Sequence, residues 1–117
     1  MIFALCLFAL PALAQNSNEF KTEKAKLAKL EKAYNVAKAA WMKDKANATK
    51  KKAYVKTTVT LGTAVMTSPA FGPKDKYPRA LRLYREALKV DPKNKEATEN
   101  SKMIVDIYRQ MGRPVPK

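Results

Sequence analysis

Apolar side chains recur every three or four residues through much of the chain, and this spacing limits the fold more than any other feature. Leu27, Leu30, Tyr34, Ala37 and Trp41 are separated by three, four, three and four residues. A helix with 3.6 residues per turn places such residues on one face. Alanine and lysine, which are strong helix formers, fill many positions between them. The pattern predicts a helix that starts at Glu19 and ends at a soft break in residues 45–48.

A second stretch, from about Ala48 to Met66, carries two adjacent apolar rows. One row is Tyr54, Thr58, Leu61 and Val65, and the other is Val55, Val59, Gly62 and Met66. A face this wide predicts contact with more than one neighbour. The β-branched run 55–59 also favours a strand, but its length and its continuing period favour a helix. Asn47 is expected to cap this helix.

Proline and glycine divide the C-terminal part of the chain. Ser68-Pro69 and Gly72-Pro73 predict a linker from Thr67 to Lys76. A third helix is expected from about Tyr77 to Val90, with Pro78 in its first turn. Asn94 is expected to cap a fourth helix that Gly112 closes. The inward residues of these two helices are predicted to be Ala80, Leu81, Tyr84, Ala87 and Leu88, and then Ala97, Ile104, Val105, Ile107, Tyr108 and Met111.

The predicted fold class is therefore all-α, with about four helices in antiparallel hairpins. Shifting the chain by 50 residues aligns Tyr34 with Tyr84, Ala37 with Ala87 and Gly62 with Gly112. This match suggests an internal repeat. Chance alignment of two amphipathic hairpins is the alternative.

The third helix also resembles a known family. Ala80, Tyr84, Ala87 and Pro92 stand at the small, aromatic, small and proline positions of the tetratricopeptide repeat (TPR). The likeness covers the second helix of that unit and the start of the next. It implies TPR-like antiparallel hairpins, as a right-handed solenoid fragment or a small bundle, over residues 19–117. Repeat arrays need three or more units, so a bundle-like closure or a homo-oligomer is expected to complete the core.

Residues 1–14 are predicted to be a signal peptide. They carry no charge, and Ala12 and Ala14 satisfy an A-x-A cleavage rule that leaves Gln15 as the first mature residue. A positive n-region is missing, and an uncleaved anchor or a buried helix is the alternative. Residues 15–18 are expected to form a flexible lead-in. The protein is therefore predicted to be exported, either periplasmic or secreted.

Composition excludes most catalytic and metal-binding classes. The chain has no histidine, one cysteine (Cys6) and three glycines. It therefore lacks the residues for a His/Cys zinc site, a Ser-His-Asp triad or a glycine-rich phosphate loop. We expect a protein that is not an enzyme and that uses no cofactor and no metal.

A net charge of +14 points to acidic partners. We expect a protein or peptide to dock in a helical groove, steered by Lys and Arg, as the TPR resemblance implies. The candidate partner-binding residues are Arg79, Arg82, Arg85, Tyr84 and Tyr108. Two alternatives stay open: binding to a polyanion or an anionic envelope surface, and a structural subunit of an oligomer. Nucleic acid is not an expected partner, because export separates the protein from it.

Overall fold

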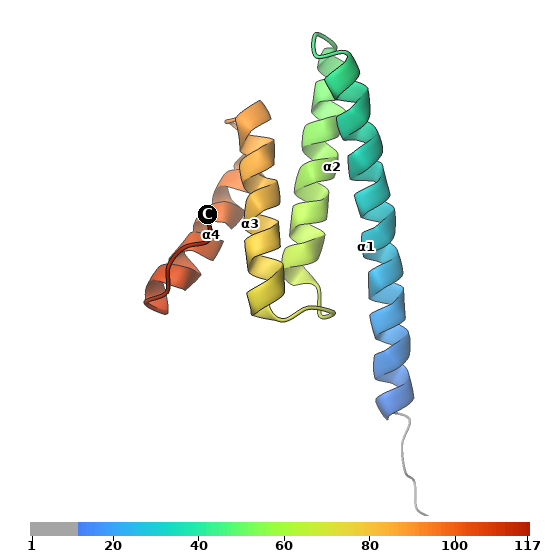
Figure 1. Cartoon of the computed structure of the whole chain (residues 1–117), viewed down its shortest axis with the longest axis vertical. Helices are drawn as coiled ribbons and strands as arrows, with labels where there is room; N and C mark the ends of the chain where they lie inside the picture. Colours follow the sequence, from blue (N-terminus) through green and yellow to red (C-terminus); the bar gives the residue numbers. More distant parts are fainter. Residues whose placement is uncertain (1–11) are drawn as a thin grey trace, which may run out of the picture.

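Short polar turns connect four α-helices in the part of the chain that the structure describes. A computed structural model describes the backbone of residues 12–117 and the side chains from residue 17 onward. The helices are α1 (Ala12–Lys43), α2 (Ala48–Thr67), α3 (Pro73–Val90) and α4 (Lys95–Gln110) (Figure 1). The described residues contain no strand. The all-α prediction is confirmed, and the β-branched run 55–59 is helical.

The predicted caps set the ends of these helices. The side chain of Asn47 accepts a hydrogen bond from the backbone N–H of Lys50 at 3.0 Å, and that of Asn94 accepts one from Ala97 at 2.9 Å. Each bond satisfies a donor that the first turn of a helix leaves free. Gly112 follows α4 with φ 64°, a left-handed conformation that ends a helix.

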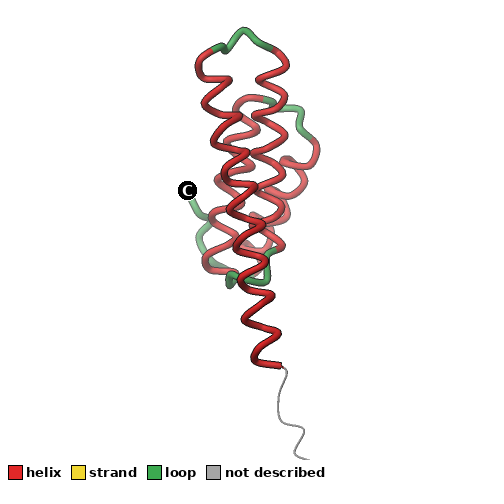
Figure 2. Tube along the Cα trace, turned by 90° about the vertical axis from the view of Figure 1, so that its right-hand side faces the viewer, coloured by secondary structure: helices red, strands yellow, loops and turns green. Residues whose placement is uncertain are grey.

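The helices form an open row in which each packs mainly on its neighbours in sequence. Figure 1 shows α2 between α1 and α3, and α4 crosses α3 at the far side. No described Cα atom of α1 comes within 8 Å of a Cα atom of α3 or α4. The wide apolar face of α2 is therefore shared between α1 on one side and α3 with α4 on the other. The molecule is a small bundle of helical hairpins, and its N-terminal helix extends beyond the others (Figure 2).

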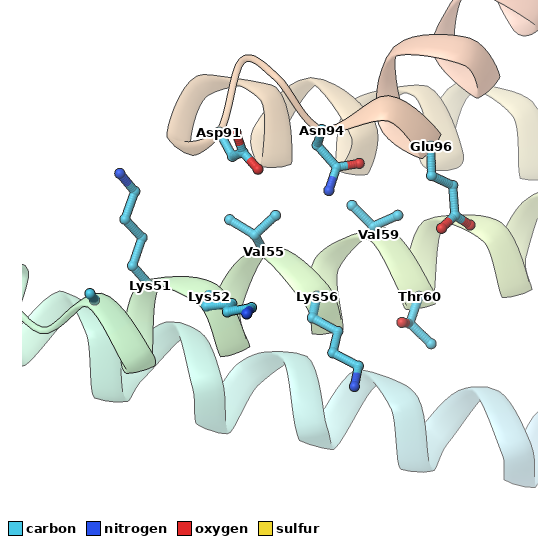
Figure 3. A pocket seen from close by; sticks show the side chains of 10 residues that line it. Lys51, Lys52, Val55, Lys56, Val59, Thr60, Asp91, Asn94 and Glu96 are labelled. Atoms are coloured by element: carbon cyan, nitrogen blue, oxygen red, sulfur yellow. The ribbon is translucent and has the colours of Figure 1, made fainter.

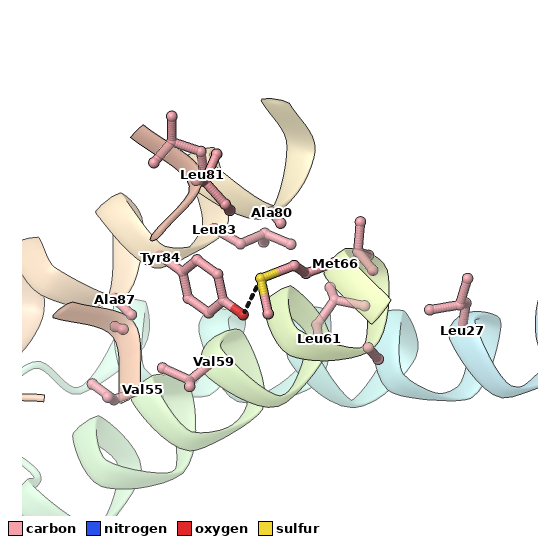
Figure 4. Packing of buried hydrophobic residues seen from close by; sticks show 14 of the residues in the cluster. Leu27, Val55, Val59, Leu61, Met66, Ala80, Leu81, Leu83, Tyr84 and Ala87 are labelled. Atoms are coloured by element: carbon pink, nitrogen blue, oxygen red, sulfur yellow. Dashed lines mark hydrogen bonds between the residues drawn. The ribbon is translucent and has the colours of Figure 1, made fainter. Parts of the chain in front are cut away.

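The core lies where α2, α3 and α4 meet, around Tyr84 (Figure 4). The side chain of Tyr84 is fully buried and packs on α2 at Gly62. A Cβ atom at Gly62 would lie 3.0 Å from Cε1 of the Tyr84 ring, a contact so tight that the ring would have to shift by a few tenths of an ångström. Other core residues match the predicted inward faces: Leu27, Tyr54, Val55, Val59, Leu61, Val65, Leu81, Ala87, Ala97 and Ile104.

Two helices begin earlier than predicted. α1 starts at Ala12, so residues 15–18 are helical where we expected a flexible lead-in. Once a helix exists, each added residue gains a hydrogen bond, and Ala12, Leu13 and Ala14 are good helix formers. The predicted signal peptide falls mainly on residues 1–11, which lie outside the described residues, and it stays a prediction.

The first turn of α3 corrects a second boundary. α3 starts at Pro73, and the carbonyl of Gly72 accepts the backbone N–H groups of Asp75 and Lys76. Proline suits the first position of a helix because its missing N–H would have no partner there. Pro78 consequently lies inside α3 rather than in its first turn, and it leaves the exposed Lys74 carbonyl without a helical donor.

One residue predicted to face inward does not. Met111 is 51% exposed, because α4 ends at Gln110 and the chain turns away at the next residues.

Candidate functional site

The structure does not bring the five predicted partner-binding residues together. Tyr84 is in the core, where its hydroxyl lies 2.9 Å from the Thr63 hydroxyl and accepts a hydrogen bond from the Asn100 amide at 3.1 Å. Burial raises the pKa of Tyr84, and these two hydrogen bonds oppose the rise. Tyr108 is half-buried on α4 and packs against the core. Both tyrosines therefore hold helices together.

The three arginines lie on α3 but in different environments. Arg79 is paired with Glu31 of α1 at 3.3 Å. Arg85 donates a hydrogen bond from Nη1 to the backbone carbonyl of Pro116 at 2.7 Å, which fastens the C-terminal residues to α3. Arg82 is exposed and has no ion pair within the described side chains.

A hollow runs along α2, beside the turn between α3 and α4. We call it the α2 groove, and its volume is about 590 Å³. Val55 and Val59 form its apolar floor and point toward Asp91 and Asn94 of the turn (Figure 3). The other lining residues are Ala48, Lys51, Lys52, Lys56 and Thr60 of α2, and Glu96 of α4.

The charges around the α2 groove are unequal. Asp91 accepts the backbone N–H of Lys93 at 3.1 Å, and Glu96 accepts the Thr63 hydroxyl at 2.7 Å, so each acid already has a donor. Lys51, Lys52 and Lys56 are exposed and form no ion pair with any side chain in the described range. Two of these lysines lie near the N-terminus of α2, where the helix dipole already favours an anion.

A cluster of polar side chains joins α1, α2 and α3. In the Glu86 cluster, which consists of Tyr34, Lys38, Tyr54 and Glu86, one carboxylate accepts from three side chains. Tyr34 donates at 2.7 and 2.8 Å to the two carboxylate oxygens, Tyr54 donates at 2.6 Å, and the Lys38 ammonium donates at 2.6 Å. The cluster links α1, α2 and α3 through a single acidic side chain.

The hydrogen bonds determine the charge of this cluster. Burial by itself would raise the pKa of Glu86, but the bonds from Lys38, Tyr54 and Tyr34 outweigh burial and lower it. The hydrogen bond to Glu86 raises the pKa of Lys38. Burial, followed by the bond to Glu86, raises the pKa of both tyrosines. The cluster is therefore held as a carboxylate, an ammonium and two neutral phenols.

Sequence reasoning missed both the α2 groove and the Glu86 cluster. A signal for the α2 groove was present in the sequence, because the spacing of Lys51, Val55 and Val59 by four residues places them in one row. Glu86 was not among the predicted site residues. Its position beside the inward residue Ala87 was the available signal that it lies at the edge of a buried face.

Neither feature has the donors of a metal site. Among the described residues, no group of three or more Cys, Asp or Glu side chains could hold a metal ion. None of the described helices combines the length and the apolar character needed to cross a bilayer. Comparison of the chain with family models, with curated proteins and with solved structures found no match.

Proposed function

We propose that this protein is a non-catalytic binding module that holds an acidic segment of another protein in the α2 groove. The observation that carries the proposal is that three lysines without an ion pair among the described side chains, Lys51, Lys52 and Lys56, line a hollow whose floor includes Val55 and Val59. A peptide with alternating apolar and acidic side chains complements both features. Its carboxylates meet the ammonium groups, and its apolar residues contact the small part of Val55 and Val59 that the fold leaves exposed, 6% and 4% of each residue.

Charge complementarity favours this occupant over a neutral one. Asp91 and Glu96 on the opposite wall accept hydrogen bonds from neutral donors and keep their negative charges, so the lining has three cations against two anions and stays net positive. An acidic segment gains attraction to three cations and to the N-terminal end of α2. A TPR-like fold and export from the cytoplasm are both consistent with peptide binding in a helical groove. We retain the TPR-like fold and the export as parts of the proposal.

The test selects a ligand and then removes the groove's charge. Short random peptides displayed on phage are selected against the immobilised full chain, and the best binder is synthesised with a fluorescent label. Its Kd is measured by anisotropy for the wild type and for the triple variant Lys51→Glu, Lys52→Glu, Lys56→Glu. We expect acidic-apolar peptides to be selected and the triple variant to weaken binding about tenfold or more.

A matched control separates the groove from general charge attraction. The variant Lys21→Glu, Lys26→Glu, Lys29→Glu makes the same change in net charge at exposed positions of α1. It is expected to keep most of the affinity. Equal weakening by both triple variants would contradict groove binding and would favour the alternative of a polyanion-binding protein. Selection of basic or purely apolar peptides would also contradict it.

A further inference from the structure

A second hollow lies between α1, α3 and the C-terminal residues, and it shares no lining residue with the α2 groove. We call it the arginine hollow, and its volume is about 540 Å³. Its lining residues are Tyr34, Arg82, Arg85, Glu86, Lys89 and Lys117. Four of these six side chains are cationic and one is acidic, so the lining is strongly positive.

The cations come from one row of α3 and from the C-terminal residues. Arg82, Arg85 and Lys89 are separated by three and four residues, which places them on one face of the helix. Lys117 is brought beside them because Arg85 holds the Pro116 carbonyl at 2.7 Å and Val115 packs on the core. This bond uses one of the five N–H donors of the Arg85 guanidinium.

The single acid of the hollow does not neutralise these cations. The Glu86 carboxylate already accepts hydrogen bonds from Lys38, Tyr34 and Tyr54, and its negative charge is balanced by the Lys38 ammonium at 2.6 Å. One turn earlier on the same helix, Arg79 has its own acid in Glu31. Arg82 and Lys89 have no such partner in the described part of the chain. The row therefore changes from a paired to an unpaired cation at the point where the hollow begins.

We propose that the arginine hollow binds a multiply charged phosphate group, either a phosphate monoester or a diphosphate. Guanidinium groups donate two parallel hydrogen bonds to a phosphate, and lysines add point charges around them. A doubly charged oxyanion needs more than one cation, and Arg82, Arg85, Lys89 and Lys117 surround the same space. The group could belong to a soluble phosphate or to the headgroup of a lipid, and the chemistry of recognition is the same for both.

The experiment titrates the full chain with two probes at a salt concentration of about 150 mM, which screens exposed charges. Pyrophosphate, followed by calorimetry, represents the soluble source. Vesicles of phosphatidylcholine with phosphatidic acid, followed by co-sedimentation, represent the lipid source, and phosphatidylglycerol vesicles supply a phosphodiester comparison. We expect binding to at least one of the two monoester or diphosphate probes, with weaker binding to the phosphodiester vesicles. The probe that binds identifies the source.

Two double variants with equal charge change test the location. Arg82→Gln with Lys89→Gln removes two cations of the hollow and is expected to weaken binding about tenfold or more. Lys21→Gln with Lys29→Gln removes two exposed lysines of α1 and is expected to change binding less than about twofold. Arg82 and Lys89 are exposed, so unchanged circular dichroism is expected to show that both variants fold.

Three results would overturn the proposal. They are no binding of either pyrophosphate or phosphatidic acid vesicles, equal weakening by the two double variants, or, where the phosphatidic acid vesicles bind, equal affinity for the phosphatidylglycerol vesicles. None of these results bears on peptide binding in the α2 groove, so the two proposals can fail separately.

Discussion

Two contacts between helices, one around Tyr84 and one around Glu86, differ in the interactions that form them. At Tyr84, the α3 helix meets α2 through a fully buried ring placed directly on Gly62. At the Glu86 cluster, α1, α2 and α3 meet through hydrogen bonds to one half-exposed carboxylate. The first contact depends on shape, because the Tyr84 ring lies so close to Gly62 that a Cβ atom there would be only 3.0 Å from the ring. The second depends on charge, because α1 and α3 do not pack directly on each other and meet through side chains, among them the Lys38 ammonium and the Glu86 carboxylate.

This difference predicts how each contact responds to change. A contact based on shape loses stability when volume is removed or added, and it is insensitive to pH and salt. A contact based on a carboxylate and an ammonium tolerates changes in volume but responds to protonation. Acid should therefore weaken the contact of α1 and α2 with α3 at Glu86 before it affects the contact at Tyr84, while the apolar packing of α1 on α2 is not sensitive to pH.

The largest effect is expected from removing the Tyr84 ring. Tyr84→Ala deletes a fully buried aromatic side chain, and we expect the free energy of unfolding in urea to fall by about 3–5 kcal/mol. Tyr84→Phe keeps the ring but loses the bonds with Thr63 and Asn100, and we expect it to cost about 1 kcal/mol. Tyr108→Ala, at a half-buried position, is the control. A loss no greater for Tyr84→Ala than for this control would show that shape does not dominate the contact.

A smaller effect is expected at the Glu86 cluster. Glu86→Leu leaves two phenols and an ammonium without their acceptor, and we expect a loss of about 2 kcal/mol in the free energy of unfolding. Glu86→Gln keeps an acceptor for the tyrosines, and we expect it to cost about 1 kcal/mol. Hydrogen exchange should show this loss mainly as increased opening of α1. Uniform loss of protection across α3 and α4 would contradict the division of the molecule into two kinds of contact.

The contrast also explains how much of the fold could be predicted from the sequence. Helix positions, the caps Asn47 and Asn94, and the inward rows of α2 and α3 depend on local spacing, and the sequence contains them directly. The starts of α1 and α3 were wrong because propagation of a helix and the tolerance of proline at its first position decide them. The predicted repeat pairs Gly62 with Gly112, yet one glycine makes room for Tyr84 and the other ends a helix.

The candidate sites were harder to predict, because they depend on which helices become neighbours. The spacing of Arg79, Arg82 and Arg85 was readable, but the pairing of Arg79 with Glu31 depends on α1 and α3 flanking α2 (Figure 1) closely enough for these two long side chains to meet. The lysines of the α2 groove line a hollow only because the turn at Asp91 lies beside Val55 and Val59 in the folded chain. In the same way, the role of Glu86 depends on neighbouring helices, because its hydrogen-bond donors Tyr34, Lys38 and Tyr54 come from α1 and α2.

The smallest of the three effects is the dependence of stability on acid. The pKa of Glu86 is lower in the folded chain than its ordinary value of 4.5, because the bonds from Lys38, Tyr54 and Tyr34 outweigh the effect of burial. A lowered pKa means that the folded state favours the ionised carboxylate. The resulting stability is fully present above pH 4.5 and is lost as the pH falls through the folded pKa.

The measurement is the free energy of unfolding in urea, followed from neutral pH into the acid range for three proteins. We expect the wild type to lose more stability in acid than Glu86→Gln, which has no carboxylate to protonate at this position. Glu31→Gln removes a more exposed carboxylate and should follow the wild type closely. If Glu86→Gln loses stability in acid as steeply as the wild type, the three-helix contact does not depend on the charge of Glu86. The two contacts of the bundle would then be of one kind.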